Sequence, residues 1–145
     1  MNAILRKSRF TLAMVTVVAG ILAAGAGMAM AATTKVTLSG DQEVPPVSTS
    51  AQGSGTITVG ADKSVSGSVN TSGVDGKAAH IHEGAPGANG PVIIPLKNTS
   101  ANVWSVPAGA KLTDAQYKSY EAGNLYINVH SAAHKDGEIR GQLKP

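Results

Sequence analysis

The four histidines of the chain lie in two short stretches, and histidine is the side chain that most often binds transition metals near neutral pH. His80 and His82 are separated by one apolar residue, and His130 and His134 follow an alternating run of apolar and polar residues. Successive side chains of an extended strand point to opposite faces, so His80 and His82 emerge on the same face. If the two stretches are neighbouring strands, about 5 Å apart, three imidazoles can converge on one point.

The stretch that leads to His130 has one apolar face and one polar face. Its odd-numbered residues from Leu125 to Val129 are apolar, whereas Tyr126 and Asn128 alternate with them. The alternation therefore places Tyr126, Asn128 and His130 together on one side of the strand, with the apolar residues directed toward a core.

Convergent imidazoles predict a metal site. Neutral imidazole binds Cu(II), Zn and Ni, and Cu(II) stands highest in the affinity order of these ions. We interpret His80, His82 and His130 as ligands of one Cu(II) ion, with His134, Glu83 or water in a fourth position. Zinc is the main alternative, because three histidines and a water also form a catalytic zinc arrangement. Surface histidines without any ligand are the simplest alternative.

The first 31 residues have the pattern of a secretory signal peptide. Three basic residues, the last of them Arg9, precede an apolar run over residues 10–24, and Ala29-Met30-Ala31 has the small residues of a cleavage site. The apolar run is shorter than the roughly 20 residues that span a membrane. We predict cleavage after Ala31, a periplasmic or secreted protein, and no membrane association after cleavage.

Residues 32–145 have balanced charge and contain no sulfur. Three of the twelve Lys and Arg lie in the leader, and the remaining nine equal the nine Asp and Glu. The resulting net charge of zero argues against nucleic acid as a partner. The chain has no Cys, and its four Met lie at or before position 30. A metal site must therefore use nitrogen and oxygen donors, and a disulfide framework is excluded.

Short alternating segments between Gly, Pro and Asn predict one all-β domain over residues 32–145. Besides the two histidine stretches, the strand-like segments are 35–40, 53–60, 65–69, 92–96, 103–106 and 137–143. One helix is expected over 111–123, because Thr113 and Gln116 form a capping box and Gly123 suits the position after a helix. Seven or eight short strands with one short helix predict an antiparallel Greek-key β-sandwich or barrel.

The remaining polar and aromatic residues have structural interpretations. Glu138 and Arg140 share one face of the last strand and are expected to form an ion pair with each other, or with Asp41 or Glu43. The segment that contains Asp41 and Glu43 is expected to be a solvated loop. Trp104 and the three tyrosines are expected to pack in the core.

Three separated motifs resemble the CHRD family, a domain named after the animal protein chordin. They are LSGDQEVPPV, HIHEGAPGANGPVI and LYINVHSAAHKDGEIRGQL, and the resemblance runs over residues 36–143. It implies an exported bacterial member with an all-β sandwich of immunoglobulin-like or superoxide-dismutase-like appearance. His80, His82 and His130 match the recurring histidines of the family, whereas His134 does not.

Taken together, these patterns predict an exported monomer or weak homodimer that binds copper, for copper handling or storage outside the cytoplasm. One alternative is a superoxide-dismutase-like copper enzyme, which requires an open coordination position. The other is a metal-free module that contacts an unknown protein partner. An enzyme is the less favoured interpretation.

Overall fold

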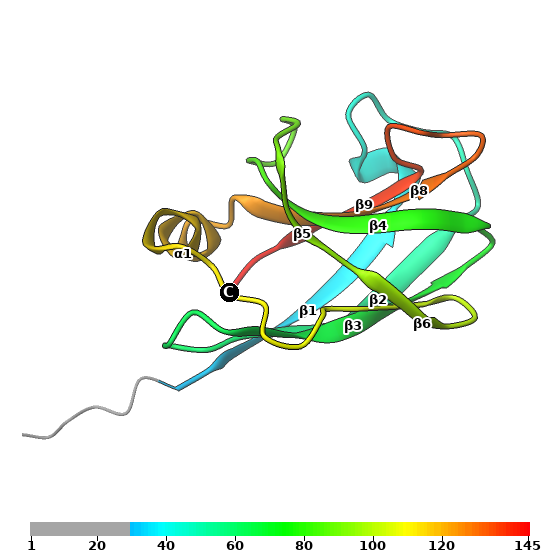
Figure 1. Ribbon diagram of the computed structural model, residues 1–145. Helices are drawn as coiled ribbons and strands as arrows, with labels where there is room; N and C mark the ends of the chain where they lie inside the picture. The colour runs from blue at the N-terminus through cyan, green and yellow to red at the C-terminus, as the bar shows by residue number, and fades with distance from the viewer. Residues whose placement is uncertain (1–29) are drawn as a thin grey trace, which may run out of the picture.

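The computed structural model describes residues 30–145, so the predicted signal peptide lies outside the described residues except for its last two. The described residues form nine strands and two helices (Figure 1). The strands are β1 (Ala32–Ser39), β2 (Gln52–Val59), β3 (Val65–Ser72), β4 (Gly76–Glu83), β5 (Val92–Pro95), β6 (Lys97–Ser100), β7 (Val103–Ser105), β8 (Leu125–Ser131) and β9 (Ile139–Leu143). The helices are the 3-10 helix η1 (Gly40–Gln42) and the α-helix α1 (Asp114–Glu121).

The strands pair antiparallel in the order β5-β4-β8-β9-β1-β2-β3-β7-β6. β1 and β9 pair only through Ser39 and Arg140. The order therefore divides there into two layers, with β4, β8 and β9 in one and β1, β2 and β3 in the other (Figure 1). β5 and β6, at the two ends of the order, are separated by Leu96 alone, whose N–H donates to the Ala79 carbonyl at 2.9 Å. This crossing nearly closes the sheet and confirms the predicted all-β antiparallel sandwich.

The core between the layers is aliphatic, as the sequence requires. Five side chains have no exposed surface: Ile57, Val69, Ile127, Val129 and Ile139. Burying each side chain of this size contributes roughly 1.5–3 kcal/mol. Ala79 and Ile81 of β4 belong to the same core. Because neighbouring residues of a strand face opposite ways, His80 and His82 are directed to the outer face of the layer.

The helix α1 begins with the predicted capping box and is shorter than the predicted range of 111–123. The Thr113 side chain accepts from the Gln116 N–H, and the Gln116 side chain accepts from the Thr113 N–H. Lys111 instead pairs with Ser64 in an isolated bridge, which keeps this residue extended. Gly123 has a φ of 75°, a conformation that favours glycine after a helix. No helix among residues 30–145 is long and apolar enough to cross a membrane.

Candidate metal centre

The outer face of β4 and β8 carries the predicted histidines in register. The cross-strand pairs are Ala78 with His130, His80 with Asn128, and His82 with Tyr126. Side chains directly opposite on one face lie about 5 Å apart, and diagonal neighbours are still within reach. The pairing of these two strands, which the alternation could only suggest, is therefore what gathers the imidazoles.

Three of the four predicted ligands come together. One ring nitrogen from each of His80, His82 and His130 can be chosen so that all three lie within 4.8 Å of one another. His80 Nδ1 and His130 Nε2 are 3.0 Å apart. Two nitrogens that each lie about 2.0–2.1 Å from one ion are separated by roughly 3 Å. The distance between His80 and His130 therefore fits two ligands of one transition-metal ion. His82 completes this histidine group, His80, His82 and His130, with a ring nitrogen no more than 4.8 Å from the other two.

Backbone carbonyls fix the tautomers of two of these imidazoles. Nδ1 of His82 lies 2.9 Å from the Gly90 carbonyl, and Nδ1 of His130 lies 2.8 Å from the Lys135 carbonyl. A carbonyl oxygen only accepts, so both Nδ1 atoms carry the hydrogen and both Nε2 atoms are acceptors. Nε2 of His130 accepts from Nδ1 of His80 at 3.0 Å. Carbonyls that orient histidines in this way are common around metal sites. Nε2 of His82 is buried and has no hydrogen-bond partner within residues 30–145.

The surroundings of His80 and His82 favour the neutral imidazole, which is the form that binds metals. Burial lowers the pKa of His80 below its ordinary value of 6.5, and the neighbouring charges of His130 and His82 lower it further. Burial also lowers the pKa of His82, against a smaller opposing effect of its hydrogen bond to Gly90. Because a charged neighbour disfavours protonation of His80, its imidazole favours the neutral form that can bind a metal ion.

Tyr126 is the packing support of His82. The two rings are stacked, with their centroids 4.8 Å apart and their planes 6° from parallel. The guanidinium carbon of Arg140 lies 3.5 Å from the centre of the Tyr126 ring. Since β8 lies between β4 and β9, these contacts reach the ring from opposite sides. The stack of His82, Tyr126 and Arg140 fixes the orientation of the His82 imidazole.

Two loops cover this face of the layer, namely residues 40–47 and 84–91. Asn89 Nδ2 donates to the Val44 carbonyl at 2.8 Å, which joins one loop to the other. Arg140 donates to the Ala85 carbonyl at 3.0 Å. The Tyr126 hydroxyl accepts from the Gly90 N–H at 3.1 Å. The loop that carries the Gly90 carbonyl, which orients His82, is therefore held in place by Tyr126 and Arg140 of the sheet.

The prediction that Glu138 and Arg140 form ion pairs is wrong. Among the described residues Arg140 forms no ion pair, and it is almost fully buried, with 1% of its surface exposed. Glu138 instead accepts from the Thr49 hydroxyl at 2.8 Å. The solvated-loop interpretation is also wrong for Glu43, which is 4% exposed. Its buried oxygen Oε1 has no hydrogen-bond partner in the described part of the chain. Burial raises its pKa to about 7, although the charge of Arg140 and the Val44 N–H oppose the shift.

The structure does not bring His134 or Glu83 into the histidine group. His134 lies in the loop between β8 and β9 and lines a cavity of about 460 Å³ together with residues 43–48. Its carbonyl accepts from the Ser131 N–H and the Gly137 N–H, which makes it part of the turn. Glu83 directly follows His82 in β4, so its side chain is directed to the other face, where it accepts from the Ser119 hydroxyl at 2.6 Å.

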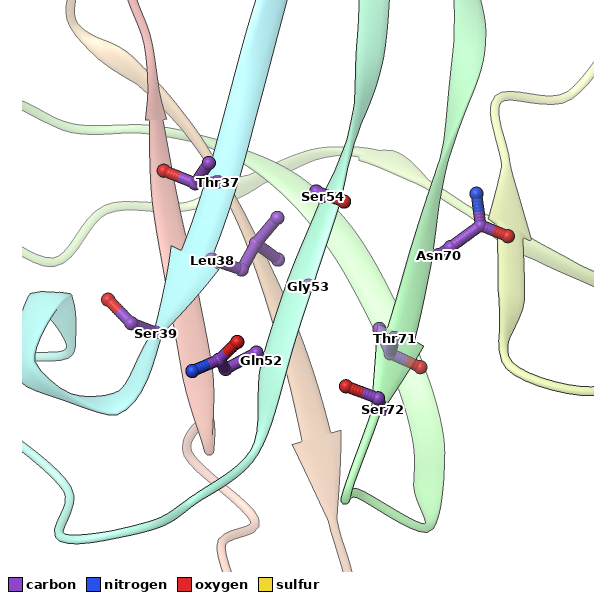
Figure 2. A pocket seen from close by; sticks show the side chains of 9 residues that line it. All are labelled: Thr37, Leu38, Ser39, Gln52, Gly53, Ser54, Asn70, Thr71 and Ser72. Carbon is purple, nitrogen blue, oxygen red and sulfur yellow. The ribbon is translucent and has the colours of Figure 1, made fainter.

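The opposite layer offers no comparable chemistry. Its outer hollow, of about 450 Å³, is lined by nine residues of β1, β2 and β3, which Figure 2 shows with their side chains. The lining consists of hydroxyl, amide and apolar groups, among them Ser39, Gln52 and Asn70, and includes no titratable side chain. The histidine face is therefore the candidate functional site.

Sequence reasoning missed three supporting groups of this site. The carbonyls of Gly90 and Lys135 are backbone atoms in loops. Every residue type has a backbone carbonyl, so the sequence does not indicate these two. Tyr126 was expected in the core, yet it packs on the histidine face. The alternation did carry that signal, because Tyr126 shares a face with His130.

A family model described as the CHRD domain matches residues 34–143 of the chain. No curated protein and no solved structure matches it.

Proposed function

The chain belongs to the CHRD domain family, and from this premise we propose that it is an exported protein that binds one copper ion through His80, His82 and His130. Its role is copper handling or storage outside the cytoplasm. The observation that carries the proposal is the gathering of three imidazole nitrogens within 4.8 Å on one half-buried face. Export follows from the signal-peptide pattern of residues 1–31.

The donor set favours copper over other ions. Residues 32–145 contain no Cys and no Met, so the site is built from imidazole nitrogen with oxygen as the remaining donor. Nitrogen and oxygen donors in a tetragonal arrangement suit Cu(II), which also stands highest in the affinity order of the divalent ions. Zinc fits the same imidazoles and is the ion that a test must compare with copper.

A titration with two variants and one control tests the proposal. Cu(II) and Zn(II) are titrated separately into the purified protein by calorimetry, and the titrations are repeated with His82→Ala and His130→Ala. We expect one equivalent of tightly bound Cu(II), and an affinity at least about 100-fold lower in each variant, because losing a ligand costs more than losing an outer partner.

His134→Ala is the matched control, since it removes an imidazole four residues beyond His130 that lies outside the histidine group. It should bind copper like the wild type. Absence of copper binding, or an equal loss in His134→Ala, would contradict the proposal and favour a metal-free interaction module. Tighter binding of Zn(II) than of Cu(II) would support the metal site and assign zinc to it instead of copper.

A further inference from the structure

Asn128 occupies the middle of the histidine face. It lies directly opposite His80 on β4 and directly opposite Arg140 on β9. Along β8 its neighbours on the same face are Tyr126 and His130. Only 2% of its surface is exposed. The three imidazoles therefore surround a buried amide that sequence reasoning left without a role.

The orientation of this amide is fixed by the loop after β8. Asn128 Nδ2 donates to the Asp136 carbonyl at 3.4 Å. Since that carbonyl can only accept, the nitrogen must face it and the amide oxygen, Oδ1, points the other way. Oδ1 is buried and has no hydrogen-bond partner among the described residues.

Nε2 of His82, like Oδ1 of Asn128, lacks a hydrogen-bond donor among the described residues. Both atoms are buried, both lack a donor, and the tautomer of His82 makes Nε2 an acceptor. The two side chains are diagonal neighbours on one face of β4 and β8, because Asn128 lies opposite His80 and His82 lies opposite Tyr126. A buried polar atom without a partner destabilises the folded protein. Two adjacent acceptors without a donor are stabilised by a cation placed between them.

We propose that Oδ1 of Asn128 is the fourth protein ligand of the ion held by His80, His82 and His130. This inference rests on the proposed function. The position that sequence reasoning gave to His134, Glu83 or water is thereby assigned to a residue already at the centre of the group. Three nitrogens and one oxygen form a donor set that suits Cu(II).

A fourth protein ligand changes what the site can do. Catalytic metal sites keep one position open for water or substrate, whereas closed sites with four protein donors hold their metal. If copper follows the same rule, Asn128 as a fourth ligand favours holding and delivering copper over a superoxide-dismutase-like reaction.

Asn128→Leu and Asn128→Asp test the inference in protein expressed from the complete chain. Leu has nearly the same shape as Asn but no oxygen, while Asp keeps the oxygen and adds a charge. Asn70→Leu is the matched control, because Asn70 is exposed on β3 in the opposite layer. Cu(II) affinity is measured by competition with a chelator, and the metal-free variants are compared by circular dichroism and thermal unfolding.

We expect Asn128→Leu to weaken Cu(II) binding by about 10- to 100-fold, Asn70→Leu to leave it unchanged, and Asn128→Asp to bind at least as tightly as the wild type. Co(II) gives a second readout, which remains decisive if Asn128→Leu does not fold. A carboxylate ligand in Asn128→Asp should change the visible absorption spectrum of the Co(II)-loaded protein.

The two possible failures are distinguishable. If the wild type binds Cu(II) and Asn128→Leu binds it equally well, or if the Co(II) spectra of wild type and Asn128→Asp coincide, Asn128 is no ligand and the three-histidine site stands. If the wild type binds neither ion, the proposed function fails and the inference fails with it.

Discussion

Replacing Glu43 by Gln should change how the stability of the protein depends on pH. Glu43 is 4% exposed, and burial raises its pKa from 4.5 to about 7. Between these two values the folded protein keeps a proton that the unfolded chain has lost. Stability therefore falls as pH rises through this range, because the folded state binds more protons. The variant Glu43→Gln keeps the shape of the side chain and has no carboxyl group to ionise.

The size of the effect follows from the shift. A change from 4.5 to about 7, at about 1.4 kcal/mol for each pKa unit, gives an upper limit of about 3 kcal/mol. A small part of this contribution is already lost at pH 5, so a loss of about 2–3 kcal/mol should develop between pH 5 and pH 8. The free energy of unfolding of the wild type, relative to Glu43→Gln, should fall by this amount over the interval.

Urea unfolding at several pH values, with a chelator present to remove metal, measures this difference. Burial lowers the pKa of His80 and of His82, but both residues are present in both proteins, so their contributions cancel in the comparison. Parallel stability profiles of wild type and variant would show that Glu43 has an ordinary pKa in the folded protein. A wild type that gains stability relative to the variant as pH rises would show that Arg140, and not burial, dominates the carboxyl group.

Three further predictions concern the site and its supports. Cu(II) affinity, measured by calorimetric titration, should stay nearly constant from pH 8 down to about 6.5 and fall only below it, because burial lowers the pKa of His80 and of His82. A steady decline of the affinity that begins above pH 7 would contradict this. Tyr126→Phe keeps the stack on His82 and loses the hydroxyl contact to Gly90, so urea unfolding should show a loss of about 1 kcal/mol, and no loss would refute the contact. Thr113→Ala should cost about 1 kcal/mol through the lost helix cap and leave Cu(II) affinity unchanged; weaker copper binding would show that α1 is coupled to the site.

Local patterns predicted those parts of the fold that local geometry decides. The alternation of residues 125–130 indicated the two faces of β8, because side chains of any extended strand must alternate. The capping box of Thr113 and Gln116 located the start of α1 within a few residues. β6, by contrast, has four exposed polar residues and no alternation, so its pairing with β7 carries no sequence signal.

The site depended on contacts between distant parts of the chain. The spacing of His80 and His82 placed them on one face, but only the pairing of β4 with β8 brings His130 beside them. Glu43 looked like part of a solvated loop because two prolines follow it, and its burial comes from the packing of that loop over Arg140. His82 and His130 are oriented by loop carbonyls, and a backbone carbonyl can come from any residue type, so the sequence does not indicate these partners.

The most direct test of the metal site is pulsed electron paramagnetic resonance of protein loaded with one equivalent of Cu(II). Histidine labelled with ¹⁵N identifies the coupled nuclei as imidazole nitrogens. We predict coupling to three imidazoles in the wild type and to two in His82→Ala, with His134→Ala identical to the wild type. A spectrum of Cu(II) without imidazole coupling, or one that His82→Ala leaves unchanged, would contradict a copper site formed by His80, His82 and His130.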